Sequence, residues 1–198
     1  MLTVVEYWTG VPDSGFSIMI QRFQFVILAT FMALVPASAM ADSKAEIDAN
    51  VQVALDEFYE KAPAGKILAD DAAGILVFPK VLKAGIGVGG EYGEGALLIG
   101  GQPVAYYNTA SASIGFQFGA QVKSQVVLFM NNQALEKFRN SSGWEAGVDG
   151  SIALIEFGAA EEISSSSIQD PIIGFIFSNR GFMYNLTFEG SKITRITR

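Results

Sequence analysis

The chain has 198 residues, of which 50% are hydrophobic and 12% aromatic, and its formal net charge is −7. It contains no cysteine and no histidine, which excludes disulfides, thiolate chemistry, an acylated lipobox cysteine and the most common general base and metal ligand. The acidic balance argues against nucleic acid as a partner, because phosphate binding depends on lysine and arginine.

Residues 1–41 have the features of an export signal. Arg22 precedes an uncharged apolar run that ends in the small-residue sequence AMA at Ala41. We expect translation to start at Met19 and cleavage to follow Ala41; a membrane anchor is the alternative, but the run is short for one. Residues 42–198 would then form a single exported domain, periplasmic or secreted, that is not a lipoprotein.

Residues 42–65 are predicted to form a helix, because apolar residues recur every three or four positions and Asp42 or Ser43 can cap it. Pro63 and Gly65 are expected to stop it, with a further helical turn over 66–74. The face opposite the apolar stripe is acidic, which favours docking on the core over lying on a membrane.

From Ile75 the hydrophobic period changes to two, which predicts strands. We expect a short strand at 75–78 that ends at Pro79, a half-buried strand at 112–122 and another at 125–130. The remaining predicted features, in chain order, are a short helix capped by Asn131 or Asn132, alternation over 144–157, a small polar loop over 158–171, a hairpin with its turn at 179–181, and a final strand over 192–197.

The stretch GIGVGGEYGEG, residues 85–95, contains the G-x-G-x-x-G spacing of a dinucleotide-binding loop. That fingerprint requires a helix that opens at the third glycine, and the residues that follow here are a poor helix start. Alternation explains the stretch better. One face of a strand carries Ala84, Ile86, Val88, Gly90 and Tyr92, and the other face, with Gly85, Gly87, Gly89, Glu91 and Gly93, is almost bare backbone. We expect close packing against the bare face, with ligand contact as the alternative. The glycines given this structural role are Gly85, Gly87, Gly89, Gly90, Gly93 and Gly95.

These patterns predict an α+β fold in which antiparallel sheet predominates, barrel-like or a curled sandwich, with an N-terminal helix and short flanking helices. Four stretches also resemble the SYLF domain family, a lipid-binding module that is described as actin-binding in some eukaryotic members. They are GILVFPKVLKAGIGVGGEYGEGALL, ASIGFQFGAQVKSQVVLFMNNQALEKF, WEAGVDGSIALIEFG and IIGFIFSNRGFMYNLTFEGSKITR. The resemblance covers nearly everything from Ala45 to the end.

The resemblance implies a β-rich, non-enzymatic module that binds membrane lipid, similar to bacterial envelope members. Three features depart from the family: no cysteine can be acylated, residues 158–161 replace a Gly-Pro-x-Gly loop, and the helix at 42–60 is acidic where some members have a basic amphipathic segment. We therefore expect membrane lipid, including anionic phospholipid, as the partner. We expect neither specificity for phosphoinositides nor binding to actin. No protein partner is assigned, and no cofactor or metal is expected.

The candidate lipid-contacting residues are Lys80, Lys83, Tyr92, Lys192 and Arg195. The alternative for Lys80 and Lys83 is that they are ordinary solvated lysines in a turn. The alternative for Lys192, Arg195 and also Arg198 is that their charges protect an edge strand from aggregation.

Other polar and aromatic residues have competing interpretations. Glu91 and Glu94 could form a catalytic carboxylate pair, but we favour solvated turn charges that pair with the lysines. Tyr106, Tyr107 and Trp144 could anchor at a membrane interface, and packing in the core or at its rim is favoured.

The leading hypothesis is an exported lipid- or membrane-binding protein without catalysis. One alternative is a structural or protein-interaction protein of the envelope that uses its sheet edges or the loop at Ser164–Ser167. The other is a carboxylate-dependent hydrolase.

Overall fold

The computed structural model describes residues 42–156, 170–181, 187–188 and 190–198, and Asp42–Arg198 form one compact unit. The predicted signal at 1–41, most of the polar loop at 158–171 with Ser164–Ser167, and residues 182–186 of the predicted C-terminal hairpin lie outside the described residues.

Two helices open the described chain. Helix α2 spans Lys44–Lys61, and the side chain of Ser43 caps it by accepting a hydrogen bond from the backbone N–H of Glu46 at 3.2 Å. Its apolar stripe is buried, which confirms the expected docking on the core; the buried residues are Ile47, Val51, Ala54, Leu55 and Phe58. Helix α3, Pro63–Asp71, begins at the proline that was expected to stop a helix, because the first helical position needs no N–H donor.

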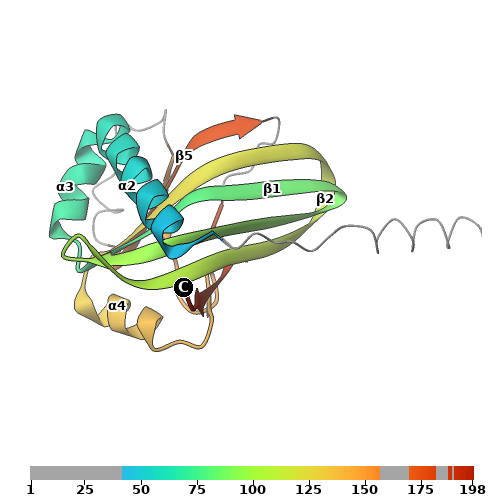
Figure 1. Cartoon of the computed structure of the whole chain (residues 1–198). Helices are drawn as coiled ribbons and strands as arrows, with labels where there is room; N and C mark the ends of the chain where they lie inside the picture. Colours follow the sequence, from blue (N-terminus) through green and yellow to red (C-terminus); the bar gives the residue numbers. More distant parts are fainter. Residues whose placement is uncertain (1–41, 157–169, 182–186, 189) are drawn as a thin grey trace, which may run out of the picture. The chain divides into compact units, whose positions relative to one another are not determined.

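A single long hairpin follows. Strand β1, Gly74–Ile99, pairs antiparallel with β2, Gln102–Phe129, and the turn between them is Gly100–Gly101 with φ of 58° and 76°. Two successive positive φ values match the right-handed twist of a two-residue hairpin, and glycine adopts them without steric cost. Figure 1 shows this ribbon curving back on itself, with α2 and α3 over one part of it.

The long hairpin corrects two predictions. The expected strand end at Pro79 is wrong: β1 continues through a bulge between Phe78 and Val81, where a residue without an N–H leaves no ladder donor unpaired. The strands predicted at 112–122 and 125–130 are both parts of β2.

The remaining strands complete a six-stranded sheet among the described residues, in the order β3-β6-β2-β5-β4, with β1 paired to β2. Their bounds are Trp144–Glu145 for β3, Ala153–Glu156 for β4, Ile172–Gly181 for β5 and Lys192–Ile196 for β6. The turn expected at 179–181 is wrong, because β5 continues there and Arg180 pairs with Val122. The alternation expected over 144–157 is broken into β3 and β4 by a turn.

The hydrophobic core has two parts, one on each side of the ribbon. One part joins α2 to alternate residues of β1, β2 and β5, and the other joins them to helix α4, Asn132–Arg139. The side chain of Asn131 caps α4 by accepting from the N–H of Ala134 at 2.9 Å, as one of the two expected caps. All pairings between the described strands are antiparallel except β4 with β5, which confirms the predicted α+β class with a curled, mostly antiparallel sheet.

Candidate functional site

The ribbon bends sharply in the glycine-rich stretch. Between the pairs Ile86–Phe118 and Val88–Ile114, β1 advances two residues while β2 advances four. The extra length on β2 bends the hairpin at this point. In Figure 1 this bend is the end of the ribbon away from α2 and α3.

The apolar face of this stretch points outward. Leu82, Val88 and Tyr92 are 47%, 65% and 49% exposed, and the small residues between them, Ala84 and Gly90, are exposed as well. We call these five residues of β1 the outer face. An exposed row of large apolar side chains is the reverse of what a half-buried strand ordinarily shows.

The glycine-bearing face points inward. A Cβ on Gly93 would lie 2.6 Å from the carbonyl oxygen of Lys80, and one on Gly95 would lie closer than 3.0 Å to that of Val77. The two halves of β1 therefore touch backbone to backbone, which is the close packing expected of a bare face. At Gly85, within the bend itself, a Cβ would meet the backbone of Gly89.

Two other glycines of the run have a different environment. Gly90 lies on the outer face, where a Cβ would meet only the carbonyl oxygen of Ser111, at 3.5 Å. Gly87 lies in β1, and the structure describes only the course of its backbone. The whole run lies within β1 and opens no helix, so it does not form the dinucleotide loop.

A buried ionic cluster lies on the inward face. The Nζ atoms of Lys83 and Lys123 lie 3.1 Å and 2.9 Å from the two carboxylate oxygens of Glu91. We call these three residues the interior triad; their side chains are 6%, 0% and 8% exposed, in the order Lys83, Lys123 and Glu91. Burial lowers the pKa of Lys123, and the attraction of Glu91 offsets only part of that effect.

The triad corrects two predictions. Lys83 was expected to lie in a turn, either solvated or in contact with lipid phosphate, but it lies within β1, buried against Glu91. The pairing of Glu91 with a lysine agrees with the prediction, but its location in a solvated turn does not. Lys123 was missed, because alternation alone does not show that a lysine at an inward position has a buried carboxylate opposite it.

Glu94 belongs to a separate cluster. It accepts a hydrogen bond from the hydroxyl of Tyr92 at 2.6 Å and is bound by two nitrogens of the Arg198 guanidinium. Burial favours the neutral acid, but the bonds from Arg198 and Tyr92 outweigh it and hold the pKa of Glu94 below its usual value. Residues three apart on a strand point to opposite faces, so Glu91 and Glu94 do not face each other as a carboxylate pair.

The remaining predicted cations are exposed. Lys80 lies at the β1 bulge, and Lys192 and Arg195 lie on β6. Because Ala110 pairs with both Tyr92 and Lys192, these two residues share one cross-strand row, about 10 Å apart. Strand β3 pairs with β6 only at Lys192 and Ile193, so Arg195 lies on a part of β6 that has β2 as its one described neighbour.

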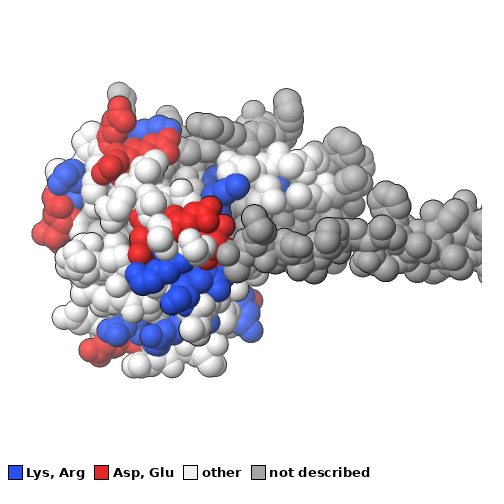
Figure 2. Space-filling model, in the orientation of Figure 1, with Lys and Arg blue, Asp and Glu red and all other residues white. Residues whose placement is uncertain are grey.

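The surface charge is mixed. Figure 2 shows acidic and basic side chains next to each other around the helices, and the described part of the ribbon beyond them is mostly uncharged. Tyr106, Tyr107 and Trp144, which could have been anchors at a membrane interface, are all buried, with exposed fractions of 8%, 4% and 2%. They pack in the core, as favoured.

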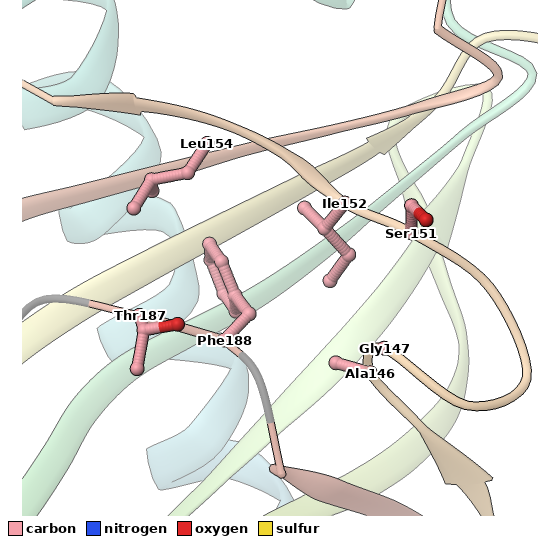
Figure 3. A pocket seen from close by; sticks show the side chains of 7 residues that line it. All are labelled: Ala146, Gly147, Ser151, Ile152, Leu154, Thr187 and Phe188. Atoms are coloured by element: carbon pink, nitrogen blue, oxygen red, sulfur yellow. The ribbon is translucent and has the colours of Figure 1, made fainter.

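A small hollow, which the sequence did not predict, opens beside β4. Its volume is about 300 Å³, and it is lined by Ala146, Gly147, Ser151, Ile152, Leu154, Thr187 and Phe188 (Figure 3). Ile152 and Phe188 both pack over Gly174, where a Cβ would overlap them. The lining carries no charged side chain.

Within the described ranges, none of the helices combines the length and the hydrophobicity that a membrane span requires. The same residues contain no group of three or more Asp or Glu side chains placed to hold a metal ion.

No curated protein matches the chain. Residues 110–197 match the model of the Ysc84 family, described as Las17-binding protein actin regulator. This segment includes most of β2 and all of α4, β3, β4, β5 and β6. The part of the SYLF resemblance that precedes residue 110, with the glycine run, lies outside the match. The match over residues 110–197 is therefore to the Ysc84 family, the SYLF domain that the sequence resembles.

Proposed function

We propose that the protein is an exported, non-enzymatic lipid-binding protein of the cell envelope and that the outer face is its membrane contact. Three things support the proposal: the family is one of binding domains, the outer face is apolar and exposed, and the two candidate carboxylates point to opposite faces of β1. The single observation that carries it is the outward orientation of Leu82, Val88 and Tyr92.

The energetics of the outer face suit a reversible membrane contact. Each of these three side chains is about half exposed, and complete burial of a large apolar side chain contributes about 1.5–3 kcal/mol. Transfer of the exposed parts into a bilayer would therefore contribute on the order of 1 kcal/mol per residue. Lys192, in the same row as Tyr92, can add attraction to anionic headgroups.

Vesicle flotation tests the proposal. The protein, purified from the expressing cells with its N-terminus determined by mass spectrometry, is mixed with phosphatidylcholine vesicles and with vesicles that also contain phosphatidylglycerol. We expect the wild type to float with the vesicles. The double variant Val88→Ser/Tyr92→Ser should bind about tenfold to a hundredfold more weakly, because about 1.4 kcal/mol corresponds to a factor of ten.

The chain provides matched controls. Val53 and Val148 are 67% and 74% exposed but lie on α2 and in the β3–β4 turn. Val53→Ser/Val148→Ser removes a similar exposed apolar area and should leave flotation unchanged. Equal losses in the two double variants would contradict a specific role for the outer face, and absence of flotation with either lipid would refute membrane binding.

Export is tested by the same mass measurement, which should find Asp42 as the first residue. Peptides from residues 1–18 in the unprocessed precursor would contradict a start at Met19. If flotation fails and crosslinking in cells yields one dominant protein partner, the interaction-protein alternative replaces the lipid proposal. Actin is not part of the proposal, because an exported protein would not encounter it in a bacterial envelope.

A further inference from the structure

The carboxylate of Glu94 accepts hydrogen bonds from three parts of the chain. The hydroxyl of Tyr92 donates to it at 2.6 Å, and two nitrogens of the Arg198 guanidinium donate as well, Nε at 3.2 Å. The backbone N–H of Asp42 also donates to this carboxylate. The Glu94 side chain is only 6% exposed, so these donors take the place of water around it.

Asp42 is the residue that the expected export would place at the N-terminus. Cleavage breaks the C–N bond between Ala41 and Asp42 and consumes one water molecule, which leaves a carboxylate on Ala41 and an ammonium on the nitrogen of Asp42. An α-amino group has an ordinary pKa of about 7.7–8.0, so it is mostly protonated at pH 7. The atom that becomes charged is the same nitrogen that donates to Glu94.

The charges around Glu94 favour an added cation. The pKa of Arg198 is raised, mainly by its hydrogen bonds to Glu94 and also by the nearby charge of the Asp42 carboxylate. Two carboxylates therefore share one guanidinium, and an ammonium at Asp42 brings the group to neutrality. Ser43, the next residue, caps α2, and a cation beside the positive end of a helix is unfavourable unless an anion lies close to it. Glu94 supplies that anion.

We propose that the α-ammonium released at Asp42 by signal cleavage forms an ion pair with Glu94, and that processing thereby stabilises the exported domain. In the precursor the same nitrogen is a neutral amide. The ammonium adds a full positive charge opposite a carboxylate with little access to water, where the attraction between charges is screened less than at an exposed site. The inference rests on the cleavage after Ala41 in the proposed function and not on the membrane contact.

Equilibrium unfolding of the processed protein tests the proposal. The wild type and a variant with one serine inserted between Ala41 and Asp42 are purified from the expressing cells, and mass spectrometry determines both N-termini. The insertion restores a neutral amide at Asp42 and moves the ammonium one residue away, about 3.8 Å along the chain. We expect the unfolding equilibrium constant in urea to rise about threefold to tenfold, because a hydrogen bond from a charged donor contributes more than one from a neutral donor.

Glu94→Gln is the matched background for the same insertion. There the insertion should change the unfolding constant by less than about twofold, because the ammonium has no carboxylate to meet. An insertion that destabilises both backgrounds equally, or neither, overturns the proposal. An N-terminus of the wild type other than Asp42 overturns it together with the cleavage in the proposed function, whereas a failure of vesicle flotation does not affect it.

If circular dichroism shows that Glu94→Gln does not fold, the pH dependence decides the question. Pairing raises the pKa of the α-ammonium, so the difference between wild type and insertion should be complete at pH 7 and shrink towards about pH 10 as the ammonium loses its proton. Arg198 and Tyr92 keep their protons in this range, because Glu94 raises the pKa of Arg198 and burial raises that of Tyr92. The Asp42 carboxylate does not change charge there. An equal difference at both pH values overturns the proposal.

Discussion

At the scale of single residues, Gly93 and Gly95 allow the ribbon to fold back on itself. Each presents bare backbone to the first half of β1, and a Cβ at either position would lie closer than 3.0 Å to a carbonyl oxygen of that half. Backbone cannot move aside as a flexible side chain can, so the contact tolerates no larger residue.

Gly95→Ala should therefore destabilise the protein by about 1–3 kcal/mol, the usual cost of overpacking a tight interior. Gly90→Ala is the control: it lies in the same strand, but the nearest atom to its Cβ would be 3.5 Å away, and we expect a change within about 0.5 kcal/mol. Urea unfolding followed by circular dichroism measures both. Equal effects in the two variants would show that the loss comes from general strand effects and not from the crossing.

Glu94 gives a pH-dependent prediction at the same scale. The hydrogen bonds from Arg198 and Tyr92 keep the pKa of Glu94 in the folded protein below its ordinary value of 4.5. Its contribution to stability is therefore complete above pH 4.5 and is lost as the pH falls through the lowered value.

Glu94→Gln removes this ionisation and should lower stability at pH 7 by about 1–3 kcal/mol, the contribution of hydrogen bonds to a charged group. The difference between wild type and variant should shrink as the pH falls below 4.5, and urea midpoints between pH 7 and pH 3 test this. A difference that stays constant across this range would mean that the carboxylate charge contributes nothing.

At the scale of elements, Phe58 is the largest side chain of the buried stripe by which helix α2 docks on the sheet. Phe58 is fully buried, and its ring lies 4.8 Å from that of Phe175 in an edge-on arrangement. Phe58→Ala should cost about 3–5 kcal/mol. Val53→Ala, at a position of the same helix that is 67% exposed, should change stability by less than about 0.5 kcal/mol. Thermal unfolding measures both variants, and equal melting temperatures for the two would contradict the docked position of α2.

The elements that sequence periodicity predicted best are those whose signal is local. Helix α2 and its cap, the short helix α4 after Asn131 and the final strand β6 were all expected, because caps and periodicity act within a few residues. The length of β1 was missed because a proline ordinarily ends a strand, and only the bulge at Phe78–Val81 allows Pro79 to stay within one. The Gly100–Gly101 turn was also missed, although two glycines between apolar runs are a hairpin signal.

The orientation of the glycine run could not have been deduced from alternation. The pattern correctly separated Val88 and Tyr92 from Gly85 and Gly93, but it does not say which side meets the core, and the usual rule would place the apolar side inward. The structure places Gly93 and Gly95 inward because the contacting surface is another segment of β1. The interior triad was hidden for the same reason, since Lys123 and Glu91 meet only once the ribbon bends.

At the scale of the whole molecule, the two faces of the bent ribbon differ in polarity. Its outer face presents apolar side chains at the end away from α2 and α3, and its inward face holds the ionic triad. Helices α2 and α3 lie over the other part of the ribbon, and under the proposed function the bend is the part that meets the bilayer.

The most direct test of the account is to ask whether the bend enters the bilayer. Because the chain has no cysteine, one cysteine at Val88 or, as a control, at Val148 can carry an environment-sensitive fluorophore. With vesicles that contain phosphatidylglycerol, the label at Val88 should shift to the blue and be quenched by lipids brominated in their acyl chains, while the label at Val148 stays in water. A water-like spectrum at Val88 in vesicle-bound protein, or equal quenching at both positions, would contradict the claim that the outer face is the membrane contact.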